Sequence, residues 1–319
     1  MTSTTQQARQ AIASAYGDPA EVIDLVDVAL PEPGAGQAVI AVQAIGVNPI
    51  DAKIVAGLMG ADESRLPRRP GHELAGRIEA LGPEVSGFAI GDAVIAYPVP
   101  GAFADRVIVE VDALRHRPDT LDAPQAAGLL LVGTTAADAV ATARVTPDDT
   151  VVVHGGAGAV GVIAIQLARG IGATVIATAS PANHDFLRSL GAVPVAYGDG
   201  VDGRIRAAAE AAVTAAIDTV GTDEAIDASL ALGVETSRIV SIAAWGRGGD
   251  GIVLIDGSSA ESQRTRAAAV DTLIADAAAG TLVTEVAATY PLEQAGAALT
   301  DQLAAHPRGK LIITPTPAP

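Results

Sequence analysis

The chain has 319 residues, enough for two domains, and its 37 Asp and Glu outnumber its 20 Lys and Arg, giving a formal net charge of −17. That balance argues against nucleic-acid partners, whose phosphate backbone requires a basic face. The absence of cysteine excludes disulfides, thiolate zinc sites and cysteine nucleophiles. No apolar run is long enough for a membrane span, and the polar first ten residues lack the apolar stretch of a signal peptide. We therefore expect a soluble, cytoplasmic protein without membrane partners.

The first third of the sequence is typical of a small β-rich domain. Short β-branched runs alternate with turns that are rich in Gly and Pro, as in QAVIAVQAIGVNP (37–49) and GDAVIAYPV (91–99). This spacing predicts a small barrel or an open β-fold.

Near residue 119 the pattern changes to Ala-rich helices that alternate with brief apolar strands. We predict strands over 150–155, 173–179, 215–220 and 237–243. Apolar side chains with helical spacing predict a helix from Val160 to Ile171. Strands that alternate with helices imply right-handed βαβ units and a parallel sheet. A last helix is expected over 292–306, before a basic turn and a final strand.

The strongest local signal is the strand–turn–helix sequence VVVHGGAGAVGVIAIQLA at 151–168. Glycines let the backbone turn tightly and approach a diphosphate closely, and the free amides at the helix start favour an anion. We favour dinucleotide binding over a purely structural turn. His154, just before the glycines, is interpreted as a hydrogen-bonded core histidine. The predicted cofactor contacts in the turn are Gly155, Gly156, Ala157, Gly158, Ala159, Val160 and Gly161.

The residues after the second of these strands favour NADPH. NAD-binding proteins place Asp or Glu at the end of that strand to hold the ribose hydroxyls. Here the strand end carries no charge, and Asp185 is expected inside the next helix. A 2′-phosphate is therefore tolerated, with Arg188 as a distant donor. The nearer predicted donors are Ser180, Asn183 and His184. The same segment also fits a simple helix N-cap, which would suit either cofactor.

Several motifs follow one another in order along nearly the whole chain. They are GVNPIDAKIVAG (46–57), RPGHELAGRIEALG (69–82), GDAVIA (91–96), GAFADRVIV (101–109), VGTTAADAV (132–140), VVVHGGAGAVG (151–161), FLRSLGA (186–192), IDTVG (217–221) and PRGKLIIT (307–314). The set resembles the medium-chain dehydrogenase/reductase superfamily, and within it the zinc-independent NADPH:quinone oxidoreductase-like branch. The resemblance implies an α/β chain: a GroES-like β-rich catalytic domain plus a Rossmann domain with a doubly wound parallel sheet.

The same resemblance implies how the chain is divided and assembled. We expect residues 1–120 to form the N-terminal part of the catalytic domain, 121–257 the Rossmann NADPH-binding domain, and 258–319 a segment returning to the catalytic domain. The active site would lie between the domains, with NADPH along the Rossmann edge. Members are commonly dimers or tetramers that pair through an edge strand, for which IVLID (252–256) is the candidate. We expect a homodimer.

Zinc-dependent relatives typically take one Cys from a GVC turn, a His from GHE and a second Cys before a later Gly. In this chain the first position is Asn48 and the last is Val132, so only His72 and Glu73 remain. Adjacent residues on a strand face opposite sides, so this pair would not converge on one ion. Because zinc binding needs several convergent ligands, we expect no metal and interpret His72 as a packing and hydrogen-bonding residue.

A metal-free reductase needs another donor for the negative charge that hydride delivery places on a carbonyl oxygen. By analogy with oxyanion holes, one positioned donor contributes about 2.7–4 kcal/mol. We expect Asn48, in the lost Cys position, to donate its amide toward the substrate or the nicotinamide ribose. Lys53 and Tyr97 are secondary candidates for substrate contact or proton supply, although Lys53 equally fits a solvated surface cation. Asp51 is expected to order the NPID turn.

Two further cofactor contacts are implied by the resemblance. Thr135 matches the family Thr that contacts the nicotinamide side, and it also fits a helix-capping hydroxyl. Lys310 lies in an RGK turn that is near the cofactor in relatives. Asp218 follows a predicted strand, at the sheet edge where ligands bind in open α/β folds, or else it caps the next helix.

The sequence thus predicts an NADPH-dependent reductase that transfers hydride to a quinone or an α,β-unsaturated carbonyl. An enoyl-thioester or polyketide-pathway reductase is an alternative, because fold does not fix substrate. A third interpretation is a catalytically silent NADPH-binding sensor. The presence of Asn48, Thr135 and the glycine turn argues against it.

Overall fold

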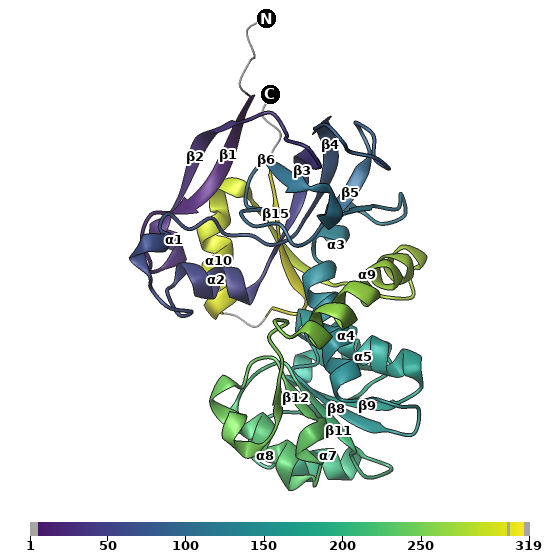
Figure 1. Cartoon of the computed structure of the whole chain (residues 1–319). Coiled ribbons are helices and arrows are strands. Elements are labelled where there is room, and N and C mark those ends of the chain that lie inside the picture. The colour runs from purple at the N-terminus through teal and green to yellow at the C-terminus, as the bar shows by residue number, and fades with distance from the viewer. Residues whose placement is uncertain (1–5, 305–306, 316–319) are drawn as a thin grey trace, which may run out of the picture. The chain divides into compact units, whose positions relative to one another are not determined.

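The computed structural model describes residues 6–304 and 307–315, which form two compact units (Figure 1). One unit holds the residues up to Leu131 together with those from Val286 onward, and the other runs from Val132 to Glu285. The chain passes from the first unit to the second within helix α4 (Leu130–Thr142). From the sequence we set boundaries near residues 120 and 257, whereas the structure keeps helix α9 (Ala260–Ala279) in the second unit.

The first unit is built on a mixed sheet in the order β14-β15-β3-β4-β5-β7, with β6 paired to β3. A separate antiparallel pair is formed by β1 and β2. The elements are β1 (Gln6–Ala13), α1 (Pro19–Val22), β2 (Ile23–Leu30), β3 (Gln37–Val47), α2 (Pro49–Val55), η1 (Glu63–Arg65), β4 (Leu74–Leu81), β5 (Ala93–Ala96), β6 (Arg106–Glu110), η2 (Val111–Ala113), β7 (Leu114–His116), α3 (Ala123–Ala127), β14 (Val286–Pro291), η6 (Leu292–Gln294), α10 (Ala295–Ala304) and β15 (Lys310–Thr314).

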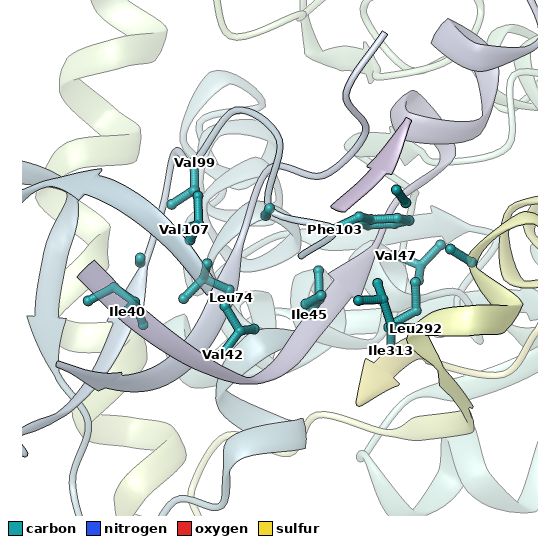
Figure 2. Packing of buried hydrophobic residues seen from close by; sticks show 14 of the residues in the cluster. Ile40, Val42, Ile45, Val47, Leu74, Val99, Phe103, Val107, Leu292 and Ile313 are labelled. Atoms are coloured by element: carbon teal, nitrogen blue, oxygen red, sulfur yellow. The ribbon is translucent and has the colours of Figure 1, made fainter. Parts of the chain in front are cut away.

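The core of this unit joins the N-terminal strands to the returning C-terminal segment. Figure 2 shows Val47 of β3 beside Leu292 and Ile313 from the end of the chain. Phe103 is completely buried in the same cluster. Because each fully buried apolar side chain of this size contributes about 1.5–3 kcal/mol, the C-terminal segment is an integral part of the β-rich unit.

The second unit contains a parallel sheet in the order β10-β9-β8-β11-β12-β13. Its first strand in sequence, β8, lies inside the sheet, which is the doubly wound arrangement expected of a Rossmann domain. Besides α4 and α9, the elements are β8 (Thr150–His154), α5 (Ala159–Ile171), β9 (Thr174–Ala179), η3 (Pro181–Asn183), α6 (His184–Ser189), β10 (Val193–Ala196), α7 (Val201–Ala208), β11 (Ala215–Asp218), α8 (Asp223–Ala231), η4 (Thr236–Arg238), β12 (Ile239–Ser241), η5 (Trp245–Asp250) and β13 (Val253–Leu254).

The GroES-like plus Rossmann prediction is confirmed, and so are the four strands predicted in the second half. The third and fourth are shorter than expected. Asp218 accepts hydrogen bonds from the amides of Val220 and Gly221 and so turns the chain out of the sheet, and a 3₁₀ turn occupies 236–238 before β12. The last helix begins later than predicted: a 3₁₀ turn occupies 292–294 before α10.

A buried ion pair fastens the end of the parallel sheet where β8 begins. Asp149 accepts two parallel hydrogen bonds from Arg238, at 2.9 and 2.8 Å, and its carboxylate also accepts from Thr146 and Thr214. The Asp149 side chain is 6% exposed. Arg238 holds the pKa of Asp149 well below its usual range. The Asp149 carboxylate therefore connects the three segments that lead into β8, β11 and β12.

None of the helices in the described part of the chain combines the length and apolar character that a membrane crossing requires.

Candidate functional site

The predicted strand–turn–helix motif forms as expected in the second unit. Strand β8 ends at His154, Gly155 turns the chain with a positive φ of 76°, and α5 begins directly after Gly158. Gly158 is the N-cap residue of α5, and within the described part of the chain no side chain caps this helix. The amides of the first helical turn are therefore left for an external acceptor, which is the arrangement that binds phosphate groups.

The glycines of the turn have different physical roles. A Cβ on Gly161 would lie 2.3 Å from the Gly155 carbonyl oxygen, and one on Gly156 would lie 2.7 Å from Cβ of Ala177. These two glycines are required for packing of helix against turn and sheet. A Cβ on Gly158 would meet only the Gly155 carbonyl oxygen, at an ordinary 3.4 Å. Packing does not explain glycine at 158, whereas close approach of a diphosphate does.

The end of β9 carries no carboxylate in the structure either. Ser180 follows the strand, and its hydroxyl accepts a hydrogen bond of 3.2 Å from the Asn183 side chain. Asp185 lies inside α6, as predicted, and pairs there with Arg188. His184 begins the same helix, and its Nε2 is buried without a hydrogen-bond partner among the described residues. Predicted donors thus stand at this strand end, and the acidic group that would repel a 2′-phosphate is absent from it.

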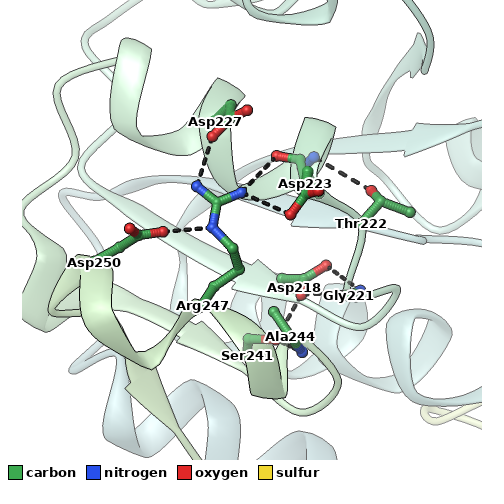
Figure 3. A network of polar contacts seen from close by, with 10 residues as sticks. Asp218, Gly221, Thr222, Asp223, Asp227, Ser241, Ala244, Arg247 and Asp250 are labelled. Atoms are coloured by element: carbon green, nitrogen blue, oxygen red, sulfur yellow. Dashed lines mark hydrogen bonds and ion pairs between the residues drawn. The ribbon is translucent and has the colours of Figure 1, made fainter.

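The loops after β11 and β12 are fixed by their own polar groups (Figure 3). Asp218 is completely buried and accepts from the amide of Gly221 and from the Ser241 hydroxyl, the latter at 2.5 Å. The Ser241 hydroxyl in turn accepts from the amide of Ala244. The α8 N-cap is Thr222, so the reading of Asp218 as a helix cap is wrong: its carboxylate organises the turn before the helix.

Arg247, on η5, joins the same two loops from the outside. Its guanidinium donates to Asp223 and Asp227 on α8 and to Asp250, as Figure 3 shows. Three carboxylates within hydrogen-bond distance raise the pKa of this arginine, led by the bond to Asp227. These ion pairs of Arg247 therefore hold α8 and η5 together.

His154 is a core histidine, as the sequence predicted. Its Nε2 lies 3.1 Å from the Ser229 hydroxyl, and its Nδ1 lies 3.4 Å from that of Thr178. Burial, which penalises the charged imidazolium, lowers the pKa of His154 despite the nearby Asp218 and Glu224 carboxylates.

This lowered pKa predicts an acid sensitivity with a defined sign. Below the unfolded pKa of about 6.5 the unfolded chain takes up the proton first. The stability from neutral His154 is therefore present above that pH and is lost as pH falls toward the folded value, by at most about 1.4 kcal/mol per pH unit. Urea unfolding at several pH values is expected to show a steeper acid loss in the wild type than in His154→Gln. Equal slopes would contradict the prediction.

Thr135 lies inside α4, not at its start, so the capping alternative is wrong for this residue. Its hydroxyl accepts a hydrogen bond of 3.3 Å from Arg266 of α9. The same guanidinium bonds to Asp138 at 2.9 Å, and Asp138 also accepts from the Ser262 hydroxyl. Arg266 was missed in the sequence because nothing within QRTRAA distinguishes one arginine from its neighbour.

In the first unit, four strand ends place the other predicted residues at one edge of the sheet. Strand β15 begins at Lys310, β3 ends just before Asn48, β4 begins just after Glu73 and β5 ends just before Tyr97. These strands are adjacent, and each is antiparallel to the next, so their ends meet. Lys53 is half-buried on α2, the helix that Asn48 precedes.

A buried ion pair organises this edge. Lys310 donates to Glu73 Oε1 at 2.8 Å and also to the Asn48 side-chain oxygen. Asn48 Nδ2 donates to the same Glu73 oxygen at 3.1 Å and to the Gly46 carbonyl at 3.3 Å. The other Glu73 oxygen accepts from the amide of Leu131. One carboxylate therefore holds β15, the end of β3 and the start of α4 together.

This network differs from the roles expected for two residues. From the sequence we assigned the Asn48 amide to the substrate or ribose and Lys310 to the cofactor. In the structure both side chains are almost completely buried, and their hydrogen-bonding groups are used within the first unit. A Cβ on Gly46 would lie 2.5 Å from Glu73 Oε1, so glycine there is needed to admit the carboxylate. In the sequence, the GHE triplet was the feature that could have pointed to this structural role of Glu73, but we interpreted it only as a possible metal site.

The donor set at this edge does not fit zinc. His72 and Glu73 lie just before β4 and have different partners: His72 Nδ1 is bonded to Asp51, and Glu73 to Lys310 and Asn48. Within residues 6–304 and 307–315, no three His, Asp or Glu side chains gather into a group that could hold a metal ion.

Comparison with known proteins identifies the family. The chain matches the alcohol dehydrogenase GroES-like domain over residues 34–153 and the zinc-binding dehydrogenase family over 159–265. A solved quinone oxidoreductase from Coxiella burnetii is 30% identical with a TM-score of 0.82, and the match covers 97% of this chain and 99% of that one. The chain belongs to the medium-chain dehydrogenase/reductase superfamily.

Other members of the superfamily are similar over different lengths. The quinone oxidoreductase of Mus musculus is 38% identical over 167 residues, which are 51% of this chain and 50% of that protein. The match thus spans about half the length of this curated relative. A mycobacterial protein solved in complex with NADPH is 28% identical with a TM-score of 0.83, over 97% of this chain and 100% of that one.

Proposed function

We propose that this chain is an NADPH-dependent reductase that transfers hydride to a quinone or an α,β-unsaturated carbonyl compound without a metal. The observation that carries the proposal is the turn before α5. Among the described residues no side chain caps the helix start, and a Cβ at Gly158 would meet the Gly155 carbonyl oxygen at an ordinary 3.4 Å, so packing does not require glycine there. Family membership and the NADPH complex of a mycobacterial relative support the same cofactor.

The residues present fit a dinucleotide. The turn from Gly155 to Gly161 would hold the diphosphate with backbone amides. No carboxylate stands at the end of β9 to repel a 2′-phosphate. That group would lie beside Ser180, Asn183 and His184. Thr135, held by Arg266, would contact the nicotinamide side. When bound, NADPH supplies the hydride, and the chain supplies orientation and protons.

At the acceptor, we propose a changed role for Asn48. Since its amide is bound to Glu73 and Gly46, it acts as a positioning residue that fixes the start of α2. Lys310 completes that support. Lys53 and Tyr97, both half-buried at or beside the same sheet edge, stay the predicted contacts for the acceptor. The experiment is Asn48→Ala: unchanged reduction rate and NADPH affinity would show that Asn48 has no role.

Consumption of NADPH, followed by its near-ultraviolet absorbance, tests the function. We expect oxidation with p-benzoquinone or cyclohexenone, and activity that survives a chelator. Turnover only with an enoyl thioester would favour the alternative reductase. Cofactor binding by calorimetry without oxidation by any acceptor would overturn the proposal in favour of a sensor.

We also propose a homodimer that pairs through strand β13. Within the described residues this strand is the edge of the parallel sheet, and its Val253 and Leu254 pair with β12 on one side. An exposed strand edge offers unpaired backbone groups to a second copy. Light scattering after size exclusion should give twice the chain mass of 31.8 kDa. The amide of Ile255 donates to β12, so that of Leu254 faces the open edge, and replacing Leu254 by Pro should shift the protein to the monomer.

A further inference from the structure

A second polar group lies at the same sheet edge and has no part in the function described so far. Asp51 is completely buried on α2. Its Oδ2 accepts from the Asn48 amide at 2.9 Å, and its Oδ1 accepts from the Gly71 amide at 2.9 Å. Oδ1 also lies 2.5 Å from His72 Nδ1. Two backbone amides thus hold the carboxylate in position, and the same carboxylate is bonded to the imidazole of His72.

His72 is held in one orientation but is not enclosed. Its carbonyl accepts from the Val99 amide at 2.7 Å, which fixes the backbone, and Asp51 fixes the ring. Because a carboxylate oxygen accepts, Nδ1 carries the proton that is donated to Asp51. The His72 side chain is 32% exposed, in contrast to 0% for Asp51. Among the described residues Nε2 has no hydrogen-bond partner, so this ring nitrogen is the one available to exchange a proton with a ligand or with water.

Reduction by hydride consumes a proton that such a group can supply. Hydride addition to an enone or quinone gives an enolate or a hydroquinone anion, and the neutral product needs one proton for each hydride. For an enone, the new bond is a C–H bond at the carbon next to the carbonyl. A positioned general acid typically accelerates such a step by about 10²–10⁴-fold.

We propose that His72, oriented by Asp51, is the proton donor of the reduction. The inference rests on the proposed reductase function. The Nε2–H bond of the imidazolium breaks as the proton joins the anionic acceptor, and the neutral imidazole then takes a proton from solvent. The step needs no further reagent, since the incoming hydride supplies the electron pair. Asp51 is a positioning residue: it keeps the ring in place and stabilises its charge.

The charges facing His72 suit this role. Burial lowers its pKa, but the hydrogen bond and charge of Asp51, together with Glu73, outweigh burial and the opposing charge of Lys310. The net effect raises the pKa of His72 above its ordinary value of about 6.5. A larger fraction of the imidazole is therefore protonated near neutral pH.

The decisive variant is His72→Asn, whose amide can still donate to Asp51 but cannot titrate. With cyclohexenone as acceptor, we expect kcat near neutral pH to fall about 100-fold. The wild-type kcat should decline as pH rises through the pKa of His72, and this decline should be absent from the variant. His116→Gln is the matched control, because His116 is an exposed histidine at the end of β7, stacked on Phe88. It should keep the wild-type rate and pH profile.

Proton nuclear magnetic resonance of the cofactor-free protein gives a readout that is independent of turnover. One of the five histidine signals should titrate above about 6.5, and it should be missing in His72→Asn. In Asp51→Asn the same signal should titrate at lower pH. The kcat decline of that variant should move in the same direction, a shift that a merely structural role of Asp51 would not produce.

Each outcome separates the inference from the function on which it rests. An inactive wild type with every acceptor would remove the function itself. An active wild type with His72→Asn at full rate and with an unchanged pH profile would overturn the proton-donor role alone. If His72→Asn does not fold, as judged by circular dichroism, His72→Gln and His72→Ala with added imidazole replace it. Recovery of rate by imidazole would support the proposal, and unimpaired kcat in the folded variants would refute it.

Discussion

Replacing Gly158 with Val is expected to remove most NADPH binding while leaving the fold intact. A side chain here meets only the Gly155 carbonyl oxygen at an ordinary distance, and the backbone has φ −73° and ψ 160°, which valine adopts readily. The methyl groups would stand where a diphosphate must approach the helix start. Losing one hydrogen bond to a charged group costs about 1.5–3 kcal/mol, so Kd should rise by about 10- to 100-fold.

Gly203→Val is the matched control for this experiment. Gly203 lies in α7 of the same unit, and no atom of the described residues lies within 4 Å of a Cβ built there. Calorimetric titration with NADPH should give the wild-type Kd for this variant. If Gly158→Val binds NADPH as tightly as the control does, the diphosphate does not lie against the turn, and the cofactor proposal fails.

The second large effect concerns stability. Asp149→Ala should lower the free energy of unfolding of the second unit by about 3 kcal/mol, the lower end of the cost of breaking a buried ion pair, since it leaves the partly buried Arg238 without its carboxylate. Thr146 and Thr214 also lose their acceptor, which frees the starts of β8 and β11. Urea unfolding followed by circular dichroism measures the change.

Asp223→Ala provides the comparison, because it also removes an Asp–Arg pair. Here the Asp223 side chain is 83% exposed, and Arg247 keeps Asp227 and Asp250 as partners. Exposed ion pairs contribute little to stability, so its unfolding midpoint should stay close to that of the wild type. Similar midpoints for the two variants would show that the Asp149 pair does not fasten the sheet.

The parallel sheet and the glycine turn were accessible from the sequence because their signals are local. A buried strand, a run of glycines and an amphipathic helix follow one another within residues 151–168, and the structure has β8, the turn and α5 there. Strand ends were less predictable. The carboxylate of Asp218 stops β11 by capturing turn amides, and no pattern of apolar residues reports that bond.

The polar partners at the candidate site could not be derived in the same way. Glu73 and Lys310 are 237 residues apart, and Thr135 and Arg266 are 131 apart. Many acidic residues in the chain could have paired with Lys310, and many arginines and lysines could have donated to the Thr135 hydroxyl, since residue type alone selects no partner. The sequence therefore singled out Asn48, Lys310 and Thr135 as individual residues without showing which side chains would occupy their hydrogen-bonding groups.

The sequence by itself determined the family, through motifs that follow in order along the chain. It also determined the α/β architecture and the position of the glycine turn, because periodicity and glycine act over a few neighbouring residues. Only the tertiary structure decided that Asn48 is buried in a network with Glu73 and Lys310 and that His72 is paired with Asp51. Those contacts depend on strand register. Antiparallel pairing brings the ends of β15, β3, β4 and β5 to one edge, where residues distant in sequence become neighbours.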